Sequence, residues 1–372
     1  MDAAAATPLP ASRPAWIEWL RSELAPTPGR GAETVRMVAT VVLVVIISNA
    51  LQVPELIISA YMVFLVSKEN KVVTTLIGVM VILGVTIGIG VSLVAYRYTF
   101  DYPELRVPVM TAILFAGFYA SRILAIGPLC LGIGFIFAAT QSIAELMPNA
   151  EYLVRWLLWL WVAVCYPIAL TVVVHRLHFP AFLGGSQPDN PAGNAPAQPK
   201  PKKPFLKPDA FTNPAHVHFA LKVSLAAMTC YFIYTGLDWP GIHTAFITCC
   251  FISLESLGAT LHKGGLRLAG CLVGGLLGFL SIMYLIPWME SITSLVLLVA
   301  AVSSIAAWVA AGSPRIAYAG LQIALAFFMC ILQKLEPDTD FDGIRDRLVG
   351  IILGIAVTTL VYRYVWPEPE AQ

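Results

Sequence analysis

The sequence is poor in charged residues and in the motifs of catalysis. Asp, Glu, Lys and Arg make up 12% of the 372 residues, against about a quarter in soluble domains. The net charge is +1 and the pI is near 7.6, so no basic surface points to a nucleic-acid partner. P-loop, GxSxG and HExxH motifs are absent. We therefore expect neither an enzyme nor a bound cofactor.

Cysteine is also scarce and poorly arranged for chemistry. All seven cysteines lie inside apolar runs, and none forms a CxxC pair. An odd count, with no histidine beside a cysteine pair, argues against a disulfide framework and against zinc. We interpret the cysteines as small buried apolar residues and expect no metal site.

Hydrophobic residues, by contrast, make up 58% of the chain and gather in long runs. Runs of about 20 apolar residues are typical of transmembrane helices. The sequence therefore predicts an all-α polytopic membrane protein with about 12 transmembrane helices, arranged as two parallel six-helix repeats. The second apolar run, 54–66, is short for a bilayer core of about 30 Å, so whether it spans fully stays open. The runs lie at 34–51, 54–66, 72–95, 107–120, 124–143, 154–174, 219–234, 242–257, 266–286, 292–311, 316–332 and 348–365.

The apolar runs divide the chain into five parts. Residues 1–33 form a cytoplasmic segment with an amphipathic helix, which lies on the membrane surface or packs on cytoplasmic loops. Residues 34–176 and 216–366 are the two membrane repeats. Between them, 177–215 is rich in Pro, Asn, Gly and Lys and predicts a flexible cytoplasmic linker. Residues 367–372 form a tail.

The basic residues predict the orientation of the chain in the membrane. With the N-terminus in the cytoplasm and twelve alternating spans, seventeen of the 23 Lys and Arg residues fall on the cytoplasmic side. This bias follows the positive-inside rule. We therefore expect a multi-pass protein of the lipid bilayer with both termini in the cytoplasm.

The two halves repeat the same chemistry at a fixed interval. Coincident charged, proline and glycine residues are harder to match by chance in a membrane protein than apolar ones. A shift of 186 positions places Arg36 on Lys222, Pro54 on Pro240, Glu69 on Glu255, Gly84 on Gly270 and Gly88 on Gly274, and a shift of 192 places Arg155 on Arg347. Symmetric halves predict a substrate path between them.

Four basic residues at these repeated positions are the first candidates for substrate binding. Charge near or within a bilayer is expensive and indicates function, so Arg36, Lys222, Arg155 and Arg347 predict a cationic path for an organic anion. Snorkelling at the membrane surface is the alternative for Arg36. His243, which can titrate near neutrality, is a further candidate, with a hydrogen-bonded interfacial role as its alternative.

Three acidic residues are candidates for carrying protons. Desolvation would make Glu69, Glu255 or Asp346 a proton carrier. The alternative for the two glutamates is a structural salt bridge with Lys71, Lys263 or Arg267.

Two GxxxG pairs lie at matching places in the halves. Gly84 and Gly88, like Gly270 and Gly274, have the spacing that allows close helix packing in lipid. Packing alone is the simpler interpretation, and a gating hinge is the alternative.

Four motifs resemble a known family. They are ELAPTPGR at 23–30, GIHTAFIT at 241–248 with SLE at 253–255, HKGGLRLAG at 262–270, and RDRLVGIILG at 345–354. Together they resemble the fusaric acid resistance and aromatic acid exporter (FUSC) family, and within it the multidrug-efflux branch. The resemblance implies an efflux antiporter of the bacterial inner membrane, driven by the proton-motive force. Its cargo would be aromatic carboxylic acids or related drugs, and its partners a periplasmic membrane-fusion protein and an outer-membrane channel.

The same resemblance marks individual positions as site candidates. They are His243, Thr244, Glu255, Lys263, Arg267, Asp346 and Arg347. We assign Thr244 to substrate binding, and Lys263 and Arg267 to structural or gating roles. Larger members carry a cytoplasmic domain between the halves, where this chain has only 177–215. The fold is also distantly similar to plant aluminium-activated malate channels.

Two other functions are compatible with the sequence. A passive organic-anion channel would use the same cations without any carboxylate, and a scaffold would organise partners without transport. The sequence also leaves a homo-oligomer open.

Overall fold

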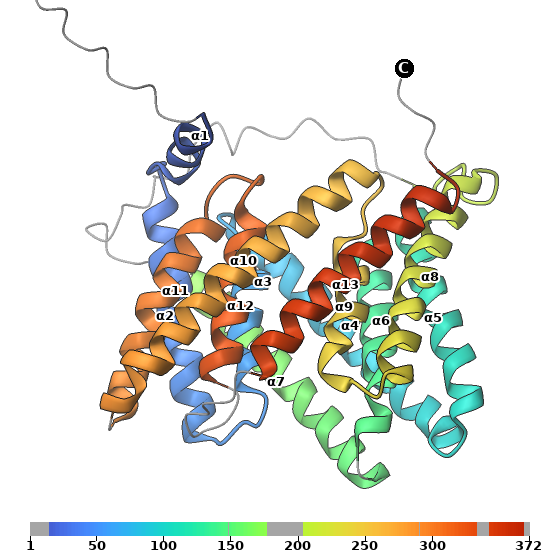
Figure 1. Ribbon diagram of the computed structural model, residues 1–372, viewed down its shortest axis with the longest axis horizontal. Helices are drawn as coiled ribbons and strands as arrows, with labels where there is room; N and C mark the ends of the chain where they lie inside the picture. Colours follow the sequence, from blue (N-terminus) through green and yellow to red (C-terminus); the bar gives the residue numbers. More distant parts are fainter. Residues whose placement is uncertain (1–14, 148, 177–203, 290, 333–341, 368–372) are drawn as a thin grey trace, which may run out of the picture.

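The computed structural model describes residues 15–147, 149–176, 204–289, 291–332 and 342–367, which are almost entirely helical (Figure 1). Apart from an isolated antiparallel bridge between Leu124 and Leu206, β-structure does not occur in these described ranges. The predicted all-α class is confirmed.

A short helix, α1 (Ala15–Leu24), precedes two sets of longer elements. The first set comprises α2 (Arg30–Ala50), α3 (Leu56–Val66), α4 (Lys71–Thr99), α5 (Pro103–Ile123), α6 (Gly127–Ser142), η1 (Ala144–Leu146) and α7 (Ala150–Arg176). The second comprises α8 (Pro214–Gly236), η3 (Pro240–His243), α9 (Thr244–Ile252), α10 (Leu257–Tyr284), η4 (Ile286–Trp288), α11 (Ile292–Ala310), α12 (Ala317–Ile331) and α13 (Asp342–Tyr364).

Seven of these helices are long and apolar enough to cross a membrane. They are α2, α4, α7, α8, α10, α11 and α13, the last from Arg345 onward. The run at 54–66 forms only the 11-residue helix α3, which at about 1.5 Å per residue covers roughly half of a bilayer core. Its counterpart α9 has nine residues. These two short helices cannot cross a bilayer by themselves.

The turn that leads into each short helix has the same geometry in both halves. Gln52 and Asp238 have positive φ angles of 51° and 50°. The amide of the next residue folds back onto the preceding helix, from Val53 to Ser48 O at 2.9 Å and from Trp239 to Tyr234 O at 3.0 Å. Positive φ is uncommon outside glycine. Its recurrence 186 positions apart is therefore a structural counterpart of the sequence repeat.

The turn that leaves each short helix also recurs. Thr74 Oγ1 accepts from the amide of Lys68 at 2.9 Å, and Thr260 Oγ1 accepts from the amide of Leu254 at 3.1 Å. Asn70 and Ser256 cap the helices that follow. Caps supply partners for amides that a helix start leaves open, so both long helices begin at sharply defined positions.

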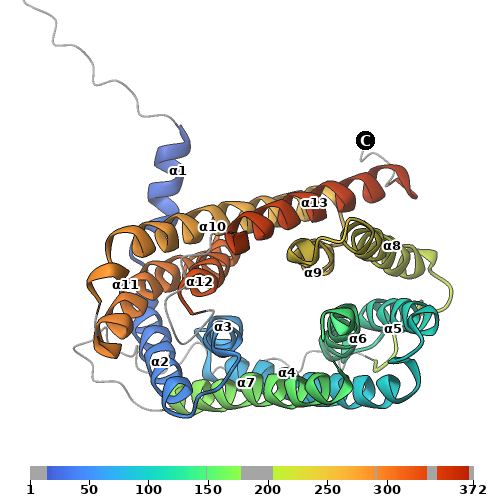
Figure 2. The ribbon, with the colours of Figure 1, turned by 60° about the horizontal axis from the view of Figure 1, so that its bottom comes forward.

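The helices form two outer layers around a set of shorter inner helices (Figure 2). The long helices α4 and α7 lie on one side, and α10 and α13 lie on the other. Between them lie α3 and α12 at one end and α6 and α9 at the other. The ends are closed by α2 with α11 and by α5 with α8. Short helices therefore occupy the centre of the molecule.

Both halves contribute to each of the two large hydrophobic cores. One core contains residues of α2, α3, α7, α11 and α12, and the other contains residues of α5, α6, α8, α9 and α13. Two edge-on aromatic pairs join the halves near the centre. The ring centroids of Phe64 and Phe328 are 6.0 Å apart, and those of Phe135 and Phe251 are 4.8 Å apart.

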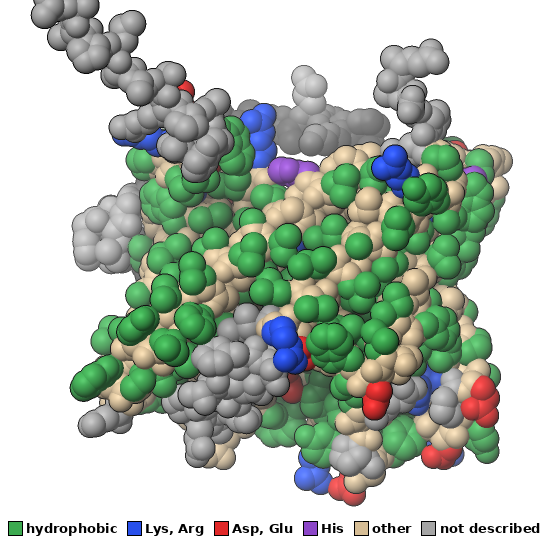
Figure 3. All heavy atoms as spheres, viewed as in Figure 1, with side chains coloured by type: hydrophobic (Ala, Val, Ile, Leu, Met, Phe, Trp, Pro, Cys, Tyr) green, Lys and Arg blue, Asp and Glu red, His purple; other side chains and the backbone are tan. Residues whose placement is uncertain are grey.

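The outer surface has the distribution of side chains that a membrane protein needs. Figure 3 shows hydrophobic side chains over most of one face, with Lys, Arg, Asp and Glu gathered mainly toward its upper and lower ends. Leu76, Leu272 and Ile352 are among the large apolar residues exposed on the long helices. Helix α1 and the end of α13 lie at the same end of the bundle (Figure 1). Lipid is the natural surrounding for such a surface.

Candidate functional site

Two buried arginines lie near each other inside the second half. Arg267 of α10 is 2% exposed and Arg347 of α13 is 5% exposed. The two guanidinium groups are close enough to repel each other. Burying an ion without a counter-charge costs several kcal/mol by continuum and experimental estimates, on the order of 3–5 kcal/mol when one partner of a pair is removed. Two cations together therefore indicate a site with a function beyond packing.

Close contacts of the helices that carry the arginines direct both side chains into the interior. Gly264, Gly270 and Gly274 lie on the buried face of α10 beside Arg267. A Cβ atom at Gly270 would lie 2.6 Å from Ala319 O, so α10 and α12 are in direct backbone contact there. This contact leaves the Arg267 side chain no route to the surface along that face.

Arg347 is held in the same way on α13. Gly350 and Gly354 follow it at helical spacing and pack directly against α9, where a Cβ atom at Gly354 would lie 2.7 Å from Ala245 O. The face of α13 that contacts α9 is therefore also the face that carries Arg347. Close contact at two glycines fixes the direction of the arginine side chain.

The hydrogen-bond partners of the two cations are neutral. Arg267 donates from Nε to Thr248 Oγ1 at 3.1 Å, and from Nη1 to Tyr318 Oη and Gln322 Oε1, each at 3.2 Å. Arg347 donates from Nη1 to the sulfur of Met329 at 2.7 Å, which is a weak acceptor. The hydroxyl-bearing ring of Tyr61, from α3 in the first half, also lies near both cations.

Several buried polar atoms at this site have no hydrogen-bond partner among the described residues. They are Nε and Nη2 of Arg347, Nε2 of Gln322 and Oγ1 of Thr244. No carboxylate in the described ranges forms an ion pair with Arg267 or Arg347. Hydrogen-bond donors without a partner, next to two cations, can bind an anionic group.

The space at the site is small in this conformation. A cavity of about 10 Å³ borders Arg347, Cys271, Met329 and Cys330, which is room for about one water molecule. Ligand sites for drug-sized molecules are typically about 300–1,000 Å³. An organic anion would therefore require α10, α12 and α13 to separate from the helices that they face.

The predicted cationic path through four repeated positions is not assembled. Arg36 of α2 and Lys222 of α8 lie at opposite ends of the molecule (Figure 2), because α2 packs on α11 while α8 packs on α5. Arg36 pairs with Glu33, and Lys222 lies 5.2 Å from the ring centroid of Tyr362. Arg155 is exposed and pairs with Glu151 at 2.9 Å. Of these four predicted residues, Arg347 alone belongs to the buried pair with Arg267.

The other substrate candidates lie near Arg347. Thr244 begins α9, and its hydroxyl lies against Gly350 of α13. His243 is half-buried and its Nδ1 lies 2.9 Å from Pro240 O. The η3–α9 junction and the first turns of α13 therefore meet at one place, as the family motifs imply.

The three predicted proton carriers are near the surface or paired. Glu255 is 78% exposed, and its carboxylate pairs with Arg122 of the first half rather than with Lys71, Lys263 or Arg267. Glu69 is exposed. Asp346 pairs with Arg345 at 2.9 Å and packs over Gly241. Their proton-carrying role stays a prediction.

The predicted gating residues occupy close helix contacts. Gly84 and Gly88 face α6, and a Cβ atom at Gly88 would lie 3.0 Å from the Ile136 Cβ. Gly270 and Gly274 face α12. Lys263 lies 5.2 Å from the Tyr318 ring centroid, on the path toward Arg267. Helix packing is thus their visible role, and gating stays a prediction.

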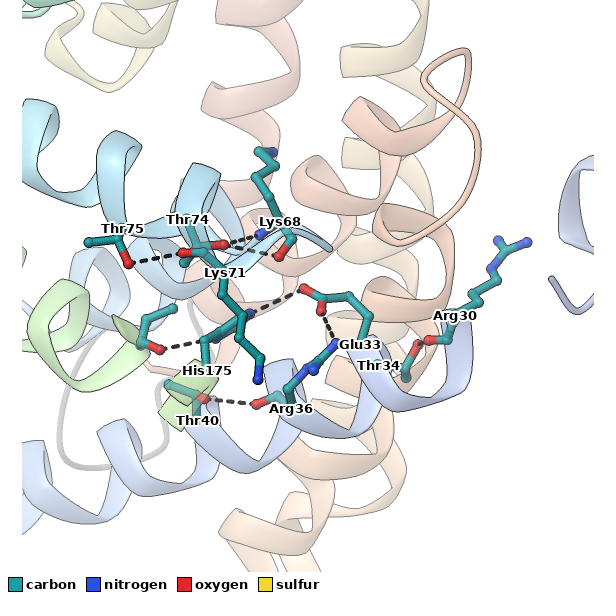
Figure 4. Close-up of polar contacts among 11 residues, drawn as sticks. Arg30, Glu33, Thr34, Arg36, Thr40, Lys68, Lys71, Thr74, Thr75 and His175 are labelled. Carbon is teal, nitrogen blue, oxygen red and sulfur yellow. Dashed lines mark hydrogen bonds and ion pairs between the residues drawn. The ribbon is translucent and has the colours of Figure 1, made fainter. Parts of the chain in front are cut away.

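A second buried polar cluster, which the sequence did not indicate, lies at the start of α2 (Figure 4). Glu33 is 3% exposed and His175, the penultimate residue of α7, is 1% exposed. Glu33 Oε2 accepts from Arg36 at 2.9 Å, and Glu33 Oε1 lies 3.4 Å from His175 Nε2. A spacing of three residues signals the pair with Arg36. No local pattern could signal a contact with a residue 142 positions away.

Comparisons with known proteins agree with the motifs. Residues 228–361 match the sequence profile described as "Fusaric acid resistance protein-like". The chain is 38% identical over 180 residues to "Multidrug resistance protein MdtO" of Shigella flexneri and to that of Escherichia coli (strain K12). The aligned part is 48% of this chain and 26% of each relative, so the chain spans about a quarter of their length.

No solved structure matches the chain. The matched residues contain both Arg267 and Arg347, together with α9 and most of the helices around them. The predicted resemblance to the fusaric acid resistance (FUSC) family and its multidrug-efflux branch is therefore confirmed over this second-half region of the chain.

Proposed function

We propose that this protein exports aromatic carboxylic acids or related organic anions across the inner membrane of a bacterium. The observation that carries the proposal is the buried pair Arg267–Arg347, two cations that form no ion pair with a carboxylate of the described residues and of which Arg347 keeps two donors without a partner. A carboxylate accepts two parallel hydrogen bonds from a guanidinium group. Tyr61, Tyr318 and Phe251 supply aromatic surface around such an anion.

Two six-helix repeats with a substrate path between them remain the architecture that we propose. The recurring turns around α3 and α9 and the shared cores support it. In this arrangement the short inner helices α3 and α9, which lie toward opposite ends of the molecule in Figure 2, are both near the middle of the bilayer. Helix α10, which carries Arg267, and helix α13, which carries Arg347, begin on opposite sides of the membrane. The anion would therefore bind near the middle of the bilayer, as in other transporters built from repeats.

The small cavity at Arg347 makes this conformation a closed one. Transport then proceeds by alternating access, in which α10, α12 and α13 move relative to α3. The glycine contacts of α10 with α12 let these two helices move as one unit. Net export against a gradient requires an energy source, and we propose exchange for protons.

The remaining features of the proposal follow the family resemblance. The N- and C-termini lie in the cytoplasm, in keeping with the basic residues on that side. A periplasmic membrane-fusion protein and an outer-membrane channel carry the cargo onward. The chain spans about a quarter of the length of its MdtO relatives, so their name supports efflux in general rather than a particular drug.

Transport by the purified protein in liposomes tests the proposal. Efflux of 4-hydroxybenzoate, benzoate and neutral benzamide would be compared with and without an imposed pH gradient, with protein-free liposomes as the control. We expect saturable efflux of both acids, faster with the pH gradient, and none of benzamide. Efflux that depends on voltage but not on the pH gradient would indicate a passive channel instead of an exporter. Rates equal to those of protein-free liposomes would instead favour a scaffold.

A further inference from the structure

The Glu33–His175 pair has the geometry of a site that holds one exchangeable proton. Nδ1 of His175 lies 3.0 Å from Thr171 O. A carbonyl oxygen can only accept a hydrogen bond, so Nδ1 carries a hydrogen. The second nitrogen, Nε2, faces Glu33 Oε1 at 3.4 Å. Between them the imidazole and the carboxylate can hold or release one proton.

The surroundings of the pair are cationic on one side and apolar on the other. The charged groups that face it are Arg36 of α2, Lys68 in the turn before α4, and Lys71, the first residue of α4 (Figure 4). Glu69 lies beside Gly29, one residue before α2. Helix α11 packs on α2 and contains no titratable residue.

Further buried polar groups follow this pair along the contact of α7 with α2 and α3. Thr171 and Thr40 are fully buried. Farther along, the hydroxyl of Tyr166 bonds to Ser48 Oγ, while the buried Ser59 donates to Ala163 O at 3.0 Å. Ser48 of α2, Ser59 of α3 and Tyr166 of α7 therefore bring three hydroxyl groups together where these three helices meet.

A second carboxylate lies near the other end of α7. Glu55, just before α3, accepts a hydrogen bond from Trp156 Nε1 at 2.7 Å. Burial raises the pKa of Glu55, and the Trp156 hydrogen bond opposes this effect in part. Trp156 and His175 are 19 residues apart on one helix, which corresponds to about 28 Å at 1.5 Å per residue. The two carboxylates therefore lie about one hydrocarbon thickness apart, which is about 30 Å.

From these observations we propose that Glu55 and the Glu33–His175 pair are the two ends of the proton route of this transporter, a proposal that rests on the proposed proton-coupled export. A proton enters at Glu55, passes along the hydroxyl groups of Ser59, Ser48 and Tyr166 with intervening water, and binds at His175 Nε2. It leaves from there to the cytoplasm. One proton is bound and one is released, with no other change in bonding.

The proton state of His175 sets how α2 and α7 meet. With both nitrogens protonated, the imidazolium attracts the Glu33 carboxylate and holds the two helices together. Once Nε2 loses its proton, its lone pair faces the carboxylate and the two repel. Helix α7 also packs on α3, which places Tyr61 beside Arg267 and Arg347. A separation of α2 from α7 therefore moves α3, and with it the Tyr61 ring at the anion site.

Exchange and driven transport, measured side by side, test this route. Glu33→Gln and His175→Asn would be reconstituted beside Glu104→Gln and His218→Asn, which change an exposed glutamate of α5 and a histidine stacked on Trp366. For the first two we expect at least a tenfold loss of pH-gradient-driven 4-hydroxybenzoate efflux with retained exchange of labelled for unlabelled anion. Both controls should behave as the unaltered protein. Driven efflux that persists in Glu33→Gln would overturn the proposal, as would loss of exchange in a variant with an unchanged melting temperature.

Infrared titration of the purified protein separates this proposal from the transport function itself. Protonation of a buried carboxyl gives a C=O stretching band. We expect one such band to be absent in Glu33→Gln and to shift its pH midpoint in His175→Asn. Bands identical to those of the unaltered protein in both variants would contradict the proton site, even if anion efflux were observed. Absence of efflux with the bands behaving as expected would contradict only the export function.

Discussion

Arg30 in the first turn of α2 donates two hydrogen bonds to the carbonyl oxygen of Trp308 in α11, from Nε at 2.8 Å and from Nη2 at 2.6 Å. Its guanidinium also lies 4.7 Å from the centroid of the Trp308 ring. From Nη1 it donates to the carbonyl oxygens of Glu23 and Ala25, each at 2.9 Å. One side chain therefore ties the end of α1 to both halves of the molecule.

Arg30→Lys is expected to destabilise the protein by about 2–3 kcal/mol, because an ammonium group cannot make the fork of hydrogen bonds and charged hydrogen bonds contribute about 1.5–3 kcal/mol each. Thermal unfolding in detergent measures the effect. Arg97→Lys, at an exposed position of α4, is the matched control and should leave the melting temperature unchanged. Equal melting temperatures for the two variants would show that the Arg30 contacts contribute nothing.

Arg347→Gln and Arg267→Gln are expected to weaken binding of 4-hydroxybenzoate by about 10- to 150-fold, the equivalent of one charged hydrogen-bonding partner. The same changes should raise the melting temperature of the ligand-free protein, since each removes one of two buried cations that repel each other. Calorimetric titration and thermal unfolding measure the two effects. Arg363→Gln, which changes an exposed residue at the end of α13, is the control.

A structural role for these arginines would reverse the second effect. If Arg347→Gln lowered the melting temperature and left the dissociation constant unchanged, the pair would be a packing feature and the anion site would be wrong. Opposite effects on stability and binding are the signature of a functional site.

Gly274→Ala is expected to destabilise the contact between α10 and α12 by about 1–3 kcal/mol, the usual effect of overpacking. A Cβ atom at this position would lie 2.9 Å from the Ala326 Cβ, and closer still to Ile323 O. Gly265→Ala on the same helix meets nothing within 4 Å, so it should be neutral or stabilise by up to about 1 kcal/mol through helix propensity. Thermal unfolding of the two variants measures this difference. Equal losses of stability in both would contradict a close contact at Gly274.

Glu55→Gln is expected to change the pH dependence of stability. Burial raises the pKa of Glu55 in the folded protein above its unfolded value. The stability that this shift contributes is fully present below the unfolded pKa and is lost as the pH rises through the folded pKa. Gln keeps an acceptor for Trp156 Nε1 and has no charge to bury, so the variant should melt higher than the unaltered protein at pH 7 and equally at pH 4.

Melting curves from pH 4 to pH 8 measure this difference. Glu104→Gln, at an exposed position, should show no such pH-dependent gain. A Glu55→Gln variant that melts lower than the unaltered protein at pH 7 would indicate that the ionised carboxylate stabilises the fold, which is the opposite of the effect expected from burial.

Local sequence patterns were sufficient for most of the helices. Apolar runs predict α2, α4, α7, α8, α10, α11 and α13 because a long stretch without charge can be satisfied only as a helix in lipid. The repeat at 186 positions aligns Pro54 with Pro240, and the structure has a positive φ angle two residues before each proline, at Gln52 and Asp238. The spacing of Gly270 and Gly274 predicts a close contact, and the structure identifies α12 as the partner.

Pairing between distant residues could not be predicted in this way. Glu255 lies near Lys263 in sequence, yet it pairs with Arg122 of the other half, because the loop before α10 meets the end of α5. Repeat symmetry suggested that Arg36, Lys222, Arg155 and Arg347 act together. Their surroundings differ, since α2 and α8 each pack on a helix of the opposite half, whereas α7 and α13 pack mainly on helices of their own half. Symmetric positions in a sequence need not have equivalent neighbours.

By itself the sequence determined the all-α class, the positions of the long apolar helices and the second-half resemblance to an efflux family. These depend on hydrophobicity, on helix length and on motifs that are contiguous in the chain. Only the tertiary structure decided that Arg267 meets Arg347, and that Glu33 meets His175. The physical reason is that a buried charge is defined by what surrounds it, and those surroundings come from helices that lie far apart in the sequence.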